Sequence, residues 1–250
     1  MSIAAAYDLL TARGARFEVE EVVVRGVPTK VWKNAPATLR DVFLGGRLFG
    51  PRTYIVYEND RATFDAFGRA VLTLAAELRR QGVAKGDRVA LIMRNLPEWP
   101  VAFFAAALVG GIVVPMNAWW TAPELEFALI DSGASAAIVD GERFERLAQS
   151  LDACPALRRV YVTRRTGGFA DRRARPLEDV VGPVNAWASL PETPLPDVPL
   201  GPEDDATIFY SSGTTGRPKG ALGTHRNMAT NIMTAGCLYA RSFLRRGEAP

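Results

Sequence analysis

The segment Arg88–Met116 reads RVALIMRNLPEWPVAFFAAALVGGIVVPM and contains two short apolar runs with a longer apolar stretch between them. The first run, Arg88–Met93, and the second, Ile112–Met116, have the length and the apolar character of buried strands. Between them, Pro97–Val109 begins at a proline and stops before a pair of glycines, as helices do. We therefore expect a strand, a helix and a second strand, which is the unit that builds parallel α/β sheets.

The same alternation continues on both sides of this unit. Upstream, apolar residues recur at helical spacing between Thr63 and Gly82, where Thr63 is placed to cap a helix and Gly82 to end it. Downstream, we expect a helix, a strand, a helix and a strand at Pro123–Asp131, Ala136–Asp140, Glu142–Leu151 and Arg159–Thr163. The predicted fold class is therefore α/β, with a doubly wound, layered sheet of parallel βαβ units.

The stretch Trp99–Pro123 carries no charged residue and is long enough to cross a bilayer. Gly110–Gly111 and Pro115 interrupt it, so we expect a buried helix, a turn and a strand instead of a membrane span. Trp119 and Trp120 are then expected to be core or interface aromatics. The first residues show no basic segment before an apolar core, so no secretory signal is expected and the default compartment is cytoplasmic.

The composition is that of an ordinary globular protein, with 250 residues of which 48% are hydrophobic. The net charge of +3 forms no basic stripe, so no nucleic-acid partner is expected. Arginines cluster between Arg143 and Arg175. We interpret this cluster as a solvated helix face and loop in preference to a contact for phosphate or coenzyme. One histidine and two cysteines without CxxC spacing exclude a zinc site built from these residue types.

A change in organisation follows at Pro183, where six prolines fall within the segment 183–202. This segment has no apolar period, which is typical of an extended connector. We divide the chain into an N-terminal α/β subdomain at 1–182, a proline-rich connector at 183–203 and the start of a second subdomain at 204–250. The acidic residues Glu203–Asp205 are interpreted as a solvated turn in preference to a metal site.

The second subdomain opens with an apolar strand and a loop of hydroxyls and glycines, ATIFYSSGTTGRPKG at 206–220. Glycines let successive backbone N–H groups turn toward an anion, and hydroxyls add donors. A lysine suits crowded phosphate oxygens, and Lys219 is informative because lysine is rare among the 30 basic residues of this chain. The candidate phosphate-binding residues are Ser211, Ser212, Gly213, Thr214, Thr215, Gly216 and Lys219.

Two other interpretations of this loop are possible, a flexible surface connection and a Walker A loop. A Walker A loop opens into a helix and needs GxxxxGK before Ser or Thr, but Pro218 and Gly220 stand at two of these positions. The extended segment Ala221–Thr224 instead predicts a strand–loop–strand hairpin. Thr224 can cap the helix that follows, and His225 in its first turn is interpreted as partly exposed, with a substrate contact as the alternative.

The segment Ile208–Lys219 resembles the phosphate-binding signature of the adenylate-forming superfamily, which includes acyl-CoA synthetases, nonribosomal peptide adenylation domains and beetle luciferases. A weaker similarity extends over Thr63–Val139, for example in Gly86–Val89 and Gly110–Asn117. The resemblance implies the N-terminal portion of an AMP-forming acyl-CoA synthetase, with the N-terminal subdomain of that fold and the start of the next. Asn117, near a strand end, is a weaker candidate for approaching a substrate.

The resemblance also implies a two-step reaction. A carboxylate attacks the α-phosphate of ATP to give an acyl-adenylate and pyrophosphate, and a thiol, usually that of coenzyme A, then displaces AMP. ATP, Mg²⁺ and coenzyme A are the implied cofactors and co-substrates, and the substrate is expected to be a small carboxylic acid, fatty or aromatic. The loop would hold the departing pyrophosphate.

Several parts that the resemblance implies are not found in this chain, namely the aromatic that stacks on adenine, the acids for ribose and magnesium, and the C-terminal domain with its catalytic lysine. No catalytic residue and no metal ligand is therefore assigned, and the chain alone is expected to be inactive. Two alternatives stay open, an enzyme that loads a carrier protein and a non-catalytic nucleotide-binding module. A homodimer is also left open.

Overall fold

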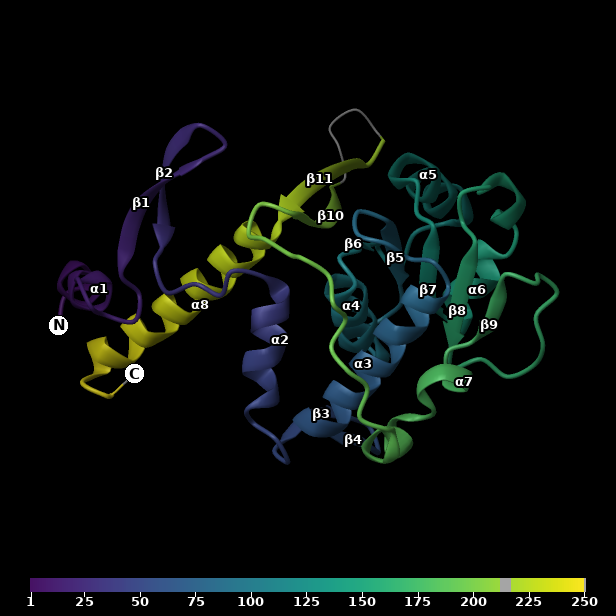
Figure 1. Ribbon diagram of the computed structural model, residues 1–250, viewed down its shortest axis with the longest axis horizontal. Coiled ribbons are helices and arrows are strands. Elements are labelled where there is room, and N and C mark those ends of the chain that lie inside the picture. The colour runs from purple at the N-terminus through teal and green to yellow at the C-terminus, as the bar shows by residue number, and fades with distance from the viewer. Residues whose placement is uncertain (212–216, 250) are drawn as a thin grey trace.

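The computed structural model describes residues 1–211 and 217–249 of the chain (Figure 1). Its centre is a seven-stranded sheet in the order β11-β10-β6-β5-β7-β8-β9. The strands are β5 (Arg88–Ile92), β6 (Ile112–Pro115), β7 (Ala136–Asp140), β8 (Arg159–Thr163), β9 (Ala174–Pro176), β10 (Asp205–Ser211) and β11 (Lys219–Thr224). All neighbouring pairs are parallel except β10 with β11. The α/β class and the parallel sheet are confirmed.

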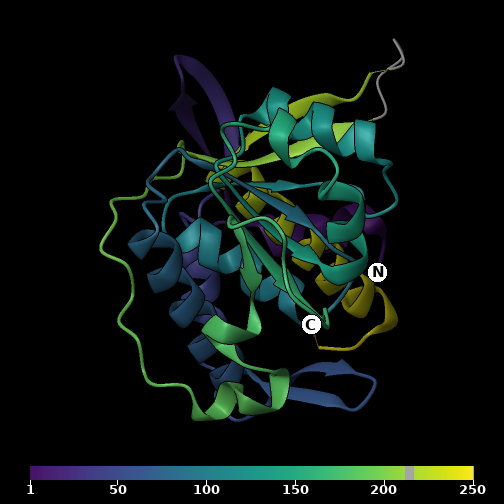
Figure 2. The ribbon, with the colours of Figure 1, turned by 90° about the vertical axis from the view of Figure 1, so that its right-hand side faces the viewer.

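Helices cover both faces of this sheet (Figure 2). They are α3 (Phe64–Arg80), α4 (Glu98–Leu108), α5 (Ala122–Ser132) and α6 (Gly141–Leu147), with the short 3-10 helix η1 (Leu151–Ala153) after α6. Val89 and Leu91 of β5 pack in the core that contains α3 and α4, whereas Ala90 and Ile92 pack in the core that contains α5 and α6. A strand buried on both faces has no polar side, which is why β5 is apolar from Val89 to Ile92.

The first quarter of the chain adds elements that were not predicted from its amino-acid pattern. They are α1 (Ile3–Thr11), the hairpin β1–β2 (Val19–Val24 and Val27–Trp32), α2 (Leu39–Arg47) and the hairpin β3–β4 (Thr53–Tyr57 and Asp60–Thr63). Both α1 and the β1–β2 hairpin lie beside α8 (His225–Arg246), away from most of the sheet (Figure 1). A small core of Leu10, Phe17, Cys237 and Ala240 joins α1 and the segment after it to α8.

The segment predicted as an extended connector, 183–203, is extended only in its second part. After α7 (Glu178–Val181), Val184–Ser189 forms the 3-10 helix η2, and Trp187 is buried in the main core. Beyond η2 the chain runs without regular structure along α2 and α3, where Arg40 Nη2 donates to the carbonyl of Val198 at 2.8 Å. Basic side chains thus satisfy backbone acceptors that form no strand ladder.

The uncharged stretch between Trp99 and Pro123 forms most of α4, then β6 and the beginning of α5. Most of it is buried between the layers, as the predicted helix, turn and strand require. Within 1–211 and 217–249, no helix combines the length and the apolar character needed to cross a membrane.

Candidate functional site

The hairpin β10–β11 carries the two described residues of the predicted phosphate-binding loop. Ser211 and Lys219 face each other as the last pair of its antiparallel register. The hydroxyl of Ser211 donates to the carbonyl oxygen of Lys219 at 3.5 Å, and both residues are exposed. Because Lys219 begins a strand, the predicted strand–loop–strand arrangement is confirmed and the helix that a Walker A loop requires is not formed there.

Directly opposite residues of an antiparallel pair have Cβ atoms about 5 Å apart, so the Ser211 hydroxyl and the Lys219 ammonium group lie within reach of one polyphosphate. The five predicted residues between them, Ser212, Gly213, Thr214, Thr215 and Gly216, lie outside the described residues. Their contribution to anion binding stays a prediction.

Helix α5 lies against this hairpin. The hydroxyl of Tyr210, which precedes Ser211, donates to Asp131 Oδ2 at 2.6 Å. The Tyr210 ring also meets the Trp120 ring edge to face, with centroids 5.9 Å apart. The two contacts connect the strand that enters the loop to α5 and to the segment before it.

A second feature lies at the carboxyl ends of β5 and β6, where a hollow of about 440 Å³ opens. It is called here the strand-end crevice, and its lining residues are Tyr57, Met93, Arg94, Asn95, Leu96, Trp99, Met116, Asn117, Ala118 and Trp119. In open parallel sheets, ligands bind at the carboxyl ends of the strands, next to the point where the connections of two neighbouring strands leave for opposite sides. Here that point lies between β5, which connects to β6 on one side, and β7, which connects to β8 on the other, and the strand-end crevice opens beside it.

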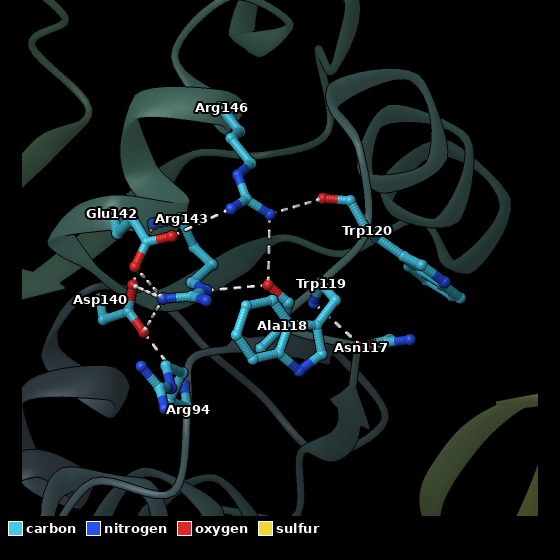
Figure 3. Close-up of polar contacts among 9 residues, drawn as sticks. All are labelled: Arg94, Asn117, Ala118, Trp119, Trp120, Asp140, Glu142, Arg143 and Arg146. Carbon is cyan, nitrogen blue, oxygen red and sulfur yellow. Dashed lines mark hydrogen bonds and ion pairs between the residues drawn. The ribbon is translucent and has the colours of Figure 1, made fainter.

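Asp140, the last residue of β7, holds the wall of the crevice together (Figure 3). Its carboxylate accepts the backbone N–H of Arg94 at 3.0 Å and that of Arg143 at 2.9 Å, and the second bond caps α6. The Arg143 side chain, with Nη1 3.4 Å from Asp140 Oδ2 and 2.8 Å from Glu142 Oε2, is almost completely buried. Among the described residues, Arg143 Nη2 has no hydrogen-bond partner.

Trp119 stands beside these charges and is 66% exposed. The guanidinium carbons of Arg94 and Arg143 lie 5.3 and 5.2 Å from its ring centroid (Figure 3). Arg143 Nε fixes the segment by donating to the carbonyl of Ala118 at 2.8 Å, and Asn117 Oδ1 accepts the N–H of Trp119 at 3.0 Å. The exposed Trp119 ring and the Arg94 guanidinium thus lie together in the lining, a pair that can bind a planar group joined to an anion.

Two sequence-based interpretations are wrong at these sites. Arg143 was placed on a solvated face, but it is 1% exposed and paired with the carboxylate of Asp140. His225 was interpreted as partly exposed, but it is also 1% exposed, and its Nδ1 accepts the N–H of Leu39 at 3.2 Å. Burial lowers the pKa of His225, so the neutral imidazole can act as an acceptor. Trp119, expected in the core or at an interface, is not a core residue.

A metal site was not predicted in this chain. In the part of the chain that the structure describes, no three His, Cys, Asp or Glu side chains gather as a metal-binding group. Asp204, in the acidic turn before β10, pairs instead with Lys85, with Asp204 Oδ2 2.7 Å from Lys85 Nζ. None of the described carboxylates is therefore identified as a magnesium ligand.

Comparison with known proteins finds similarity to one group of enzymes. The family described as AMP-binding enzyme matches residues 47–247. A long-chain-fatty-acid–CoA ligase of Escherichia coli O6:H1 is 32% identical over 233 residues, which cover 85% of this chain and 41% of the relative. A feruloyl-CoA synthase of an Amycolatopsis species is 36% identical over 171 residues, which cover 68% of this chain and 30% of the relative. The chain thus spans less than half the length of these curated relatives.

Solved structures show the same similarity in three dimensions. A long-chain-fatty-acid-CoA ligase from Archaeoglobus fulgidus has a TM-score of 0.68 at 28% identity, and the match covers 81% of this chain and 40% of that one. An anthranilate CoA ligase in complex with anthranoyl-AMP has a TM-score of 0.66 at 25% identity, over 76% of this chain and 35% of the other. The layered α/β architecture described above is similar to the N-terminal part of these enzymes.

Proposed function

Since the chain belongs to the AMP-binding enzyme family, we propose that it is the N-terminal part of an ATP-dependent acyl-CoA synthetase, an acid–thiol ligase that forms AMP. The observation that carries this proposal is the β10–β11 hairpin, which sets Ser211 opposite Lys219 at the mouth of the loop. The similarity to CoA ligases of different substrate classes supports the same reaction. The proposal concerns the whole protein, because the chain spans 41% of the length of one such relative.

The loop would act in the first step of this reaction. A carboxylate oxygen of the substrate bonds to the α-phosphorus of ATP while the bond from that phosphorus to the bridging oxygen breaks. Pyrophosphate leaves with the electron pair, so negative charge grows on its oxygens. The Lys219 ammonium and the Ser211 hydroxyl, together with donors predicted at Ser212, Thr214 and Thr215, stabilise that charge and lower the barrier.

In the second step the thiolate of coenzyme A bonds to the acyl carbon, and AMP leaves with the electron pair. We propose that the strand-end crevice takes the phosphate-bearing adenosine end of coenzyme A. Trp119 offers a face for the base and Arg94, which lines the crevice, supplies positive charge, whereas Arg143 is buried against Asp140 and holds the Ala118 carbonyl. A carrier protein, the alternative acceptor, presents its thiol without an adenosine, so the crevice favours coenzyme A.

The substrate class is proposed from the relatives, whose names point to long-chain fatty acids and to ferulate. A fatty or aromatic carboxylate is therefore expected. Mg²⁺ would accompany ATP, and the cytoplasmic location and a homodimer are carried forward as predictions. A non-catalytic nucleotide-binding module remains the second candidate, since the loop alone could hold a nucleotide.

The function is tested by pyrophosphate release from the full-length protein supplied with ATP, Mg²⁺ and a panel of fatty and aromatic carboxylates. We expect release that depends on one carboxylate class, and thioester formation when coenzyme A is added. The 250-residue chain under the same conditions should release none. Absence of release by the full-length protein with every carboxylate would contradict the ligase and leave the nucleotide-binding module.

A further inference from the structure

We infer that Tyr210 is a positioning residue, which holds the strand that enters the phosphate-binding loop in place through the bond of its hydroxyl to Asp131 on α5. This inference rests on the proposed function, because the loop concerned is the one that would hold the polyphosphate. Tyr210 precedes Ser211 directly, whereas Asp131 lies 79 residues earlier in the chain. The bond therefore fixes the entry of the loop to an element that is distant in sequence.

The hydrogen bond itself is short and charge-assisted. The distance from the Tyr210 hydroxyl to Asp131 Oδ2 is 2.6 Å, and the carbonyl of Ala128 on the same helix lies 3.4 Å from that hydroxyl. Burial raises the pKa of Tyr210, and the bond to Asp131 raises it further. The hydroxyl consequently stays protonated and remains a donor at physiological pH.

The ring of Tyr210 contacts the other strand of the hairpin. Tyr210 is paired with Gly220, the residue that directly follows Lys219. A Cβ at Gly220 would lie 3.3 Å from Cζ of Tyr210 and 2.8 Å from Cγ2 of Ile208, so the absence of a side chain at Gly220 lets the ring approach. One side chain thus touches both strands from which the loop emerges.

Helix α5 is a suitable support because both of its ends are fixed. Thr121 and Glu124 form a capping box at its start, and Gly133 ends it in a left-handed conformation with φ of 61°. The hairpin contacts it at a second place, where the Arg217 guanidinium carbon lies 5.9 Å from the ring centroid of Phe127. Binding groups that are held in place before an anion arrives lose less conformational freedom when it binds, and this applies to Ser211 and Lys219 at the held strand ends.

The test is ATP binding to the 250-residue chain by calorimetry, for the wild type, Tyr210→Phe, Asp131→Ala and the double variant. Loss of one hydrogen bond should weaken binding about fivefold in each single variant. The double variant should lose no more than either single one, because both remove the same interaction. Asp131→Asn keeps an acceptor, so its affinity should stay within about twofold of the wild type.

Tyr239→Phe is the matched control, since this tyrosine lies on α8 and is 68% exposed; its affinity for ATP should equal that of the wild type. Unchanged affinity in Tyr210→Phe, or losses that add in the double variant, would overturn the inference.

Hydrogen exchange of the amides from Lys219 to Leu222 gives a readout that does not need ATP. It should be faster in Tyr210→Phe and Asp131→Ala and near wild type in Asp131→Asn. If the wild-type chain binds no ATP, the proposed role of the loop in this chain fails, and the exchange rates alone decide the positioning role: unchanged rates refute it.

Discussion

His225 is a buried polar side chain that joins two helices. It is the first residue of α8, and its Nδ1 accepts the backbone N–H of Leu39, the first residue of α2. The first N–H groups of a helix have no partner within the helix, so this imidazole satisfies one of them. Burial lowers the pKa of His225, Asp204 acts in the opposite direction, and Lys85 and Arg40 add to the lowering.

A pH-dependent stability follows from this lowered pKa. The unfolded chain, with a histidine pKa of about 6.5, takes up the proton before the folded chain does, so the contribution is fully present above that pH and is lost as the pH falls below it. His225→Asn keeps an acceptor and removes the titration. Thermal unfolding between about pH 7.5 and pH 5.5 should show a larger fall in Tm for the wild type than for the variant. Equal pH dependence of the two would contradict this origin.

The junction of β7 and α6 depends on one carboxylate. Asp140 ends the strand, caps the helix, accepts the N–H of Arg94 and compensates the buried charge of Arg143. Glu142 is the second carboxylate on Arg143, but its side chain is 59% exposed, so it is more strongly screened.

We expect Asp140→Ala to lower the free energy of unfolding by about 2–4 kcal/mol, since it removes a helix cap and leaves a buried guanidinium less compensated. Urea denaturation measures this loss. The control is Asp152→Ala, because Asp152 pairs with Arg173 at 3.3 Å from a fully exposed position, and it should leave stability nearly unchanged. Equal losses in the two variants would show that Asp140 has no special role.

The elements that could be predicted are those whose pattern is local. The strands at Ala136–Asp140 and Arg159–Thr163 agree with the prediction to the residue, because each is an apolar run between turn residues. The β10–β11 hairpin followed from the extended segment Ala221–Thr224 after the loop. By contrast, the order of strands and the packing of α1 on α8 depend on contacts between distant segments, which no periodicity reports.

The strand-end crevice could also be predicted only in part, because it too depends on contacts between distant segments. Asp140 and Arg143 are three residues apart after a buried strand, a spacing that could have suggested a helix cap with an ion pair. The burial of Arg143 could not be predicted, because the segment around Ala118 that covers it comes from another βα connection. Tyr210 and Asp131 likewise meet only when α5 lies beside the hairpin.

At the scale of the whole molecule, the N-terminal segment packs against the C-terminal helix α8. Phe17 and Cys237 lie in one small core that connects the N-terminal segment to α8, and β10 enters the main sheet by pairing Thr207 with Val113 of β6. Residues before the proposed boundary at 183–203 therefore pack against residues after it, both in this small core and in the main sheet. The division into subdomains stays a prediction.

Removal of the Phe17 ring should open this small core. Phe17→Ala is expected to lower the free energy of local unfolding by about 3–5 kcal/mol. It should also expose the thiol of Cys237, a residue that is 3% exposed in the wild type. Labelling with a thiol reagent should then become at least about tenfold faster at Cys237, because local opening governs access. Cys154, buried in a separate core, is the internal control and should keep its rate. Equal acceleration at both cysteines would indicate global unfolding and contradict the local packing.

The central claim is that this chain carries the polyphosphate-binding half of an adenylate-forming site, and Lys219 tests it most directly. Calorimetric titration with ATP should compare the wild-type chain with Lys219→Ala and with Lys30→Ala, an exposed lysine on β2. A charge-assisted bond contributes about 1.5–3 kcal/mol, so Lys219→Ala should bind ATP at least about tenfold more weakly, and Lys30→Ala should match the wild type. Equal affinity of the wild type and Lys219→Ala would contradict the claim.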